Sequence, residues 1–178
     1  MSGFTNFFKH LHTINRHRFL VCKYCFKVGI GWQGLTHDLS KYSISEFWPS
    51  VKHFQGYRSP NEAEREHYGY SKAWLHHKGR NKHHFEYWSD FNKEIMAYAP
   101  VKMPIKYVKE MLCDRIAASK VYLKDKYNDS SALNYLINHK DGLKMHEDTK
   151  NLIISWLTML SEKGEKETFK YIRKVKEY

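Results

Sequence analysis

The chain has little of what marks secreted, membrane-spanning or disordered proteins. Its three cysteines, Cys22, Cys25 and Cys113, are too few for a framework of several disulfides. No apolar run approaches the ~20 residues that a membrane helix needs, and the first residues lack the pattern of a signal peptide. Hydrophobic residues make up 42% of the chain and aromatic residues 16%, which argues against disorder. We therefore expect a cytoplasmic protein with no membrane partner.

The charge is strongly unbalanced. The 178 residues carry 30 Lys and Arg against 19 Asp and Glu, a formal net charge of +11. This balance favours anionic partners, namely phosphate-containing small molecules or nucleic acid. The length is that of one domain, so we expect residues 1–178 to form a single unit. The twelve histidines are clustered rather than scattered, and the oligomeric state is left open.

Apolar residues recur at steps of three and four along most of the chain, which predicts an all-α, compact helical domain. The first helix is predicted over residues 7–28. Further helices are predicted over residues 44–51, 60–78, 84–95, 105–123, 132–138 and 149–160, and from residue 165 onward. Ser43 and Glu46 are spaced as a capping box at the start of the helix predicted over residues 44–51. We find no alternating strand pattern of useful length.

The segment His37-Asp38-Leu39-Ser40-Lys41 is the most informative stretch. An imidazole and a carboxylate on neighbouring residues can both reach one divalent cation, and transition metals and zinc accept such ligands. Lys41 adds a positive charge suited to a phosphate on that metal. The pair alone is common, so the prediction depends on further ligands from other helices.

Helical phase selects those ligands. His17 fills a gap in the apolar stripe of the first helix, His77 continues the stripe of residues 63–74, and His84 begins the stripe of residues 88–95. Adjacent positions on a helix point about 100° apart. The neighbours His76 and His83 therefore point away from these stripes, and we keep them as the alternatives. Asp114 lies at the edge of an apolar face, where an ionised carboxylate needs a partner or a metal.

Each of these residues also has a simpler interpretation. His17 could be a hydrogen-bonded core residue, Asp114 could pair with a lysine or arginine, and Asp38 could cap a helix. Five segments that each offer one inward His or Asp are harder to explain separately, so we favour a joint metal site. Glu46 already has a structural role in its capping box, and catalysis is the second interpretation of it.

The order His … His-Asp … Asp, with Leu-Ser-Lys after the pair, resembles the HD superfamily of metal-dependent phosphohydrolases. The stretches 37–43, 73–88 and 113–120 are also similar to an uncharacterised bacterial family of about this length. Two departures from HD proteins are a short interval between His77 and His84, and Ser40 where many members have glycine. The resemblance implies a helical domain that holds one or two divalent ions (Mn, Fe, Zn, Mg or Co) through His17, His37, Asp38, His77, His84 and Asp114, with Asp38 bridging.

The expected activity is hydrolysis of a small phosphoester, with a nucleotide preferred. Asp38, Lys41 and Glu46 are the candidate catalytic residues. Positive side chains would stabilise the phosphoryl group, and the candidates are Lys41, Arg80, Arg115 and Lys120. Three alternatives remain: a di-iron oxygenase on the same fold, a basic nucleic-acid-binding module, and a protein that keeps a metal only for folding.

Overall fold

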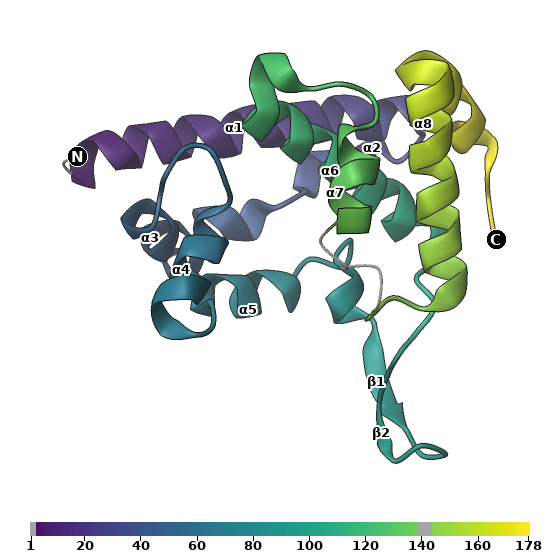
Figure 1. Cartoon of the computed structure of the whole chain (residues 1–178), viewed down its shortest axis with the longest axis horizontal. Coiled ribbons are helices and arrows are strands. Elements are labelled where there is room, and N and C mark those ends of the chain that lie inside the picture. The colour runs from purple at the N-terminus through teal and green to yellow at the C-terminus, as the bar shows by residue number, and fades with distance from the viewer. Residues whose placement is uncertain (1–2, 139–143) are drawn as a thin grey trace.

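The computed structural model describes residues 3–138 and 144–178, and most of them are helical (Figure 1). The prediction of a mostly helical protein is confirmed. Within these ranges, no helix combines the length and the apolar character that crossing a membrane requires. The α-helices are α1 (Gly3–Lys27), α2 (Gly31–Thr36), α3 (Ile44–Lys52), α4 (Pro60–Tyr68), α5 (Lys72–Lys78), α6 (Ile105–Leu123), α7 (Ser131–Asn138) and α8 (Glu147–Lys174). Short 3₁₀ turns are η1 (Leu39–Tyr42), η2 (Phe85–Tyr87) and η3 (Lys124–Lys126).

Helix α1 is the longest straight element in the view of Figure 1, and it packs against α2 and α6. Gly29, at φ 82°, ends it in the left-handed conformation that glycine adopts without strain. Helix α2 then returns onto α1 at close range. A Cβ on Gly34 would lie 2.7 Å from the Cβ of Cys25, so this contact needs glycine, and it brings the His37 segment back to the middle of α1.

The main apolar core lies between α1, α6 and α8. Leu112 and Ile116 of α6 are fully buried together with Ile153 and Leu157 of α8. Figure 1 shows α8 crossing the C-terminal end of α1. The two helices predicted over 149–160 and from 165 form this one element, which kinks at Gly164 (φ 72°).

A smaller apolar cluster holds α3 against the N-terminal half of α1. Ile14, Phe47 and Val51 are its buried members. Helix α3 also packs against α4 and α5. The helix predicted over 60–78 is therefore two helices: Gly69 (φ 79°) ends α4, and the Ser71 hydroxyl accepts a hydrogen bond from the Trp74 N–H to begin α5.

The prediction of a helix over residues 84–95 is wrong. This region contains η2 and a β-hairpin, in which β1 (Ser89–Asn92) pairs antiparallel with β2 (Ala97–Pro100). The side chain of Asn92 accepts hydrogen bonds from the backbone N–H groups of Glu94 and Ile95, a local turn that competes with helix formation. Figure 1 shows the hairpin projecting from the helical body.

Candidate metal centre

Asp38 lies at the centre of a buried polar cluster, and its backbone explains how it gets there. The residue adopts the left-handed conformation (φ 54°) that aspartate tolerates better than most residues. Its side chain is 0% exposed, and it makes no capping hydrogen bond to η1. The helix-cap interpretation of Asp38 is therefore wrong. A strained residue at the centre of a cluster is common at functional sites.

Arg18 of α1 holds the segment that carries His37 and Asp38. Its Nε donates to the carbonyl oxygen of His37 at 2.7 Å, and its Nη2 donates to that of Leu35 at 3.1 Å. Arg18 follows His17 in the sequence, so the same turn of α1 supplies a cluster residue and the anchor of the neighbouring segment.

One group of side chains surrounds the Oδ2 atom of Asp38. His37 Nε2 lies 3.2 Å from this oxygen and His17 Nε2 lies 3.6 Å from it. Asp114 of α6 completes the group, with Oδ1 3.0 Å from His17 Nε2 and 3.6 Å from His37 Nε2. One ligand atom from each of these four residues lies within 4.8 Å of the others. We call this the first group.

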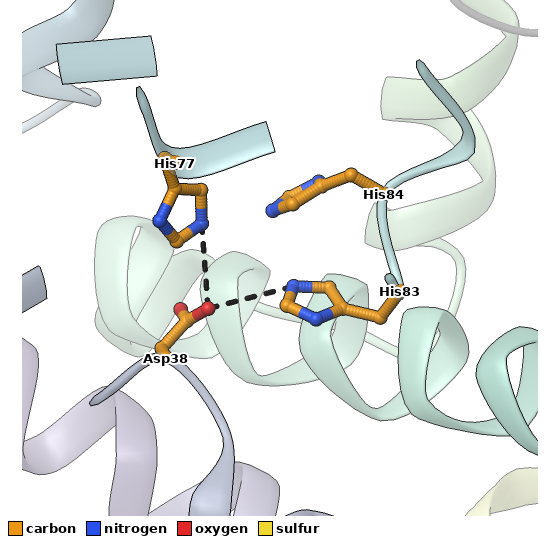
Figure 2. Close-up of side chains that lie close together, drawn as sticks. All are labelled: Asp38, His77, His83 and His84. Carbon is orange, nitrogen blue, oxygen red and sulfur yellow. Dashed lines mark ion pairs between the residues drawn. The ribbon is translucent and has the colours of Figure 1, made fainter. Parts of the chain in front are cut away.

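A second group surrounds the other oxygen of Asp38, Oδ1 (Figure 2). His77 Nε2 lies 3.3 Å from it and His83 Nε2 lies 3.6 Å from it. His84 is the fourth member, and all four offer ligand atoms within 4.8 Å of one another. The Nε2 atoms of His83 and His84 are buried and have no hydrogen-bond partner in the described part of the chain. Asp38 thus presents one oxygen to each group.

Two glutamates lie behind the histidines. Glu110 Oε1 accepts a hydrogen bond from His37 Nδ1 at 2.9 Å and lies 3.2 Å from His83 Nδ1, within ion-pair distance. Glu46 Oε2 lies 2.8 Å from His77 Nδ1. Because a carboxylate only accepts, each of these Nδ1 atoms carries the proton and each Nε2 faces Asp38. This is the arrangement in which carboxylates orient metal-binding imidazoles.

The electrostatics of the cluster favour a cation. Burial alone would raise the pKa of Asp38, but His37, Lys41 and His77 hold it well below its usual value. Asp114 follows the same pattern, because His17 and His37 outweigh burial. Burial would lower the pKa of His37, yet the surrounding carboxylates raise it well above its usual value. The cluster therefore keeps its aspartates ionised and favours positive charge between them.

The six residues predicted as ligands lie together in these two groups. The choice of His84 over His83 was too narrow, because both histidines belong to the second group. Helical phase could not separate them, since the segment after α5 is not helical. His76, the alternative to His77, instead places its Nδ1 2.6 Å from Glu46 Oε1.

The predicted catalytic residues Lys41 and Glu46 both reach the cluster. Lys41 Nζ lies 2.7 Å from Asp38 Oδ2. The capping box expected for Glu46 is wrong: Ser43 precedes α3 but makes no side-chain capping bond. Glu46 instead turns its carboxylate to His76 and His77.

The other predicted phosphate-binding residues are spread out. Arg115 follows Asp114 on α6, and its Nε is buried with no hydrogen-bond partner among the described residues. Arg80 is exposed and contacts the carbonyl oxygen of His76 in the preceding helix. Lys120 pairs with Glu165 of α8, so the structure does not bring it to the cluster.

Each group has three buried members and one partly exposed member, which is Asp114 in the first group and His84 in the second. The side chain of Asp114 is 17% exposed and that of Lys41 is 31% exposed, whereas His77 and His83 are 4% and 1% exposed. Two surface cavities of about 520 and 440 Å³ lie around Lys52 and His53, and no cluster residue lines them. Both groups therefore contact solvent through one partly exposed residue.

Fold and site together define a helical protein with a buried histidine and carboxylate cluster built on one aspartate. The chain belongs to a family of unknown function, DUF5662, whose model matches residues 6–159. That match runs from the first turn of α1 to about the middle of α8, and so includes every residue of the cluster. No curated protein and no solved structure matches the chain.

Proposed function

We propose that this chain is a metal-dependent phosphohydrolase of the HD type that acts on a small phosphoester. The carrying observation is the position of Asp38, whose two oxygens face two separate groups of imidazoles. A carboxylate between two sets of nitrogen ligands suits a pair of divalent ions. The order of these residues along the chain is the order of ligands in two-metal HD proteins, and the helical fold agrees with it.

The residues fit a metal on the chemistry of their donor atoms. Buried polar atoms normally have hydrogen-bond partners, yet the Nε2 atoms of His83 and His84 have none among the described residues. The first group would hold one ion through His17, His37, Asp38 and Asp114, and the second would hold another through Asp38, His77, His83 and His84. The large share of imidazoles favours Mn, Fe, Zn or Co over Mg, which prefers oxygen ligands.

When bound, such ions supply Lewis acidity and a water of lowered pKa for attack on phosphorus. Side chains of the protein would bind and stabilise the phosphoryl group. Lys41 is partly exposed and pairs with Asp38, so it can turn to a phosphoryl oxygen next to the cluster. Arg115, next to Asp114, would add a second positive charge there. Both charges would stabilise the developing negative charge on the phosphoryl group.

A nucleotide is the first substrate class to test. The net charge of +11 attracts polyanionic ligands. The test is phosphate release from nucleoside phosphates, sugar phosphates and phosphodiesters by protein freed of metal and reloaded with Mn, Fe, Zn, Co or Mg. We expect turnover that needs metal, disappears in Asp38→Asn and falls in Lys41→Ala. Lys170→Ala, which removes an exposed lysine of α8, is the control and should match wild type. Turnover that persists in Asp38→Asn would contradict the proposal.

The same donor atoms support a second candidate, oxygenation at two irons. Five imidazoles contribute to the two groups, and mixed imidazole and carboxylate ligands are also those of non-haem iron. This reaction predicts bound iron, consumption of oxygen and no phosphate release. A protein that binds no metal but binds nucleic acid in a salt-dependent way would instead be the basic binding module.

A further inference from the structure

Glu110 has an unusual position, because it touches both groups of the candidate metal centre. A single oxygen, Oε1, lies 2.9 Å from His37 Nδ1 in the first group and 3.2 Å from His83 Nδ1 in the second. The two imidazole rings lie next to each other, with centroids 4.4 Å apart. Asp38 contacts the Nε2 side of both rings, so Glu110 and Asp38 hold the same two histidines from opposite edges.

Glu110 is itself fixed. The residue is 5% exposed, and its other oxygen, Oε2, accepts a hydrogen bond from Gln33 Nε2 at 2.8 Å. Gln33 lies on α2, whereas Glu110 and Asp114 lie one turn apart on the same face of α6. Contacts at both carboxylate oxygens therefore hold Glu110 in place between α2 and the two histidines.

Glu46 provides the contrast. It contacts His77 of the second group at 2.8 Å and His76 outside both groups. Among the described residues, no contact of Glu46 with the first group is found. The two glutamates are chemically alike, yet one reaches both groups and the other reaches one.

We propose that Glu110 is a positioning residue that couples the two metal sites. This inference rests on the proposed function, since it needs metal at both groups. By fixing Nδ1–H on a histidine of each group, Glu110 aims both Nε2 atoms at the ions and adds negative charge behind both ligands. Because one carboxylate orients a histidine in each group, the loss of Glu110 should weaken metal binding at both sites together.

The test is calorimetric titration of Mn²⁺ into the metal-free full chain. Wild type, Glu110→Gln and Glu46→Gln are compared, with electron paramagnetic resonance to detect exchange-coupled manganese pairs. We expect Glu110→Gln to weaken both binding steps by about 10- to 100-fold, as loss of an outer carboxylate typically does, and to lose the coupled signal. Glu46→Gln should weaken one step and leave the other unchanged.

Other results would overturn the inference. Wild-type affinities in Glu110→Gln, or a loss confined to one step, would show that Glu110 does not couple the sites. If Glu110→Gln fails to fold, Gln33→Ala removes the partner of Glu110 and should weaken both steps to a smaller degree; unchanged steps would refute coupling. In the Zn²⁺-loaded wild type, nitrogen-15 spectra should show Nδ1–H on both His37 and His83. If wild type itself binds no Mn²⁺, the proposed function has failed rather than the role of Glu110.

Discussion

The protein has two interiors of opposite character, and α6 contributes to both. Leu112 and Ile116 of this helix are buried among apolar side chains of α1 and α8, whereas Glu110 and Asp114 face the histidines. Apolar burial stabilises the fold by roughly 25 cal/mol per Å². Buried charges, in contrast, are weak evidence for stability, because desolvation offsets their attraction. We therefore expect the apolar interior to hold the fold, whereas the polar interior should contribute little to stability.

The largest expected effect on stability comes from the apolar interior. Leu157→Ala removes a fully buried side chain and should lower the free energy of unfolding by about 2–5 kcal/mol. Urea denaturation measures this, and the folded protein should still bind metal like wild type. Leu123→Ala, at a side chain that is 41% exposed, is the matched control and should cost much less. Equal losses in the two variants would contradict the placement of the core.

Removing one metal ligand should reduce the metal content far more than the free energy of unfolding. His17→Ala alters only the first group and His84→Ala only the second, so each should lose about one equivalent of metal. Activity should fall by more than about 100-fold, since loss of an outer partner already costs 10- to 100-fold. Metal analysis after dialysis and phosphate release are the measurements. Full metal content in either variant would remove that residue from the centre.

Removing the metal with a chelator should lower the stability of the protein by the contribution of the polar interior alone, without any mutation. Metal at 100 times its dissociation constant stabilises a folded protein by about 2.7 kcal/mol, and a chelator should remove that amount. Thermal unfolding with and without metal measures it. Asp38→Ala should show no such shift, because it lacks the residue common to both groups.

Arg18→Ala should have a smaller effect, and it should lower both the stability and the metal affinity. The change removes hydrogen bonds to the carbonyl oxygens of His37 and Leu35, which we expect to cost about 1–2 kcal/mol. Metal affinity should fall with it, because the segment carrying Asp38 loses its anchor. The neighbour Arg16 is exposed, and Arg16→Ala should change neither quantity. The comparison requires denaturation and metal titration of the two variants.

The β-hairpin should matter least. Tyr98→Ser alters a side chain that is 76% exposed, and the change in stability should stay within about 0.5 kcal/mol. Metal content should match wild type. A large loss of metal in Tyr98→Ser would show that the hairpin supports the cluster, contrary to the structure.

Much of the helical fold could be predicted, because its signals are local. The stripe containing His17 and the apolar pattern after Pro104 predict α1 and α6, which the structure contains. The hairpin was missed because apolar steps between Trp88 and Ile95 imitate a helix. Turn chemistry at Asn92 outweighed that pattern.

The residues of the candidate site likewise differ in how well local sequence patterns predict them. Asp38 stood out because its neighbour in sequence, His37, is also its neighbour in space. Glu110 was missed, since its importance comes from histidines of two other segments that only the fold brings to it. The spacing of Glu110 four residues before Asp114 was the one available signal. Lys120 was expected at the phosphate, but its partner Glu165 is 45 residues away in sequence, a contact that local pattern does not reveal.

The most direct test of the central claim is elemental analysis of the full chain purified without chelator, as wild type and as Asp38→Ala. The account predicts about two equivalents of Mn, Fe, Zn or Co in the wild type and loss of both in the variant, because Asp38 is shared. A wild type that carries no metal and cannot be loaded with these ions would contradict the account. The basic surface would then be the better guide to function.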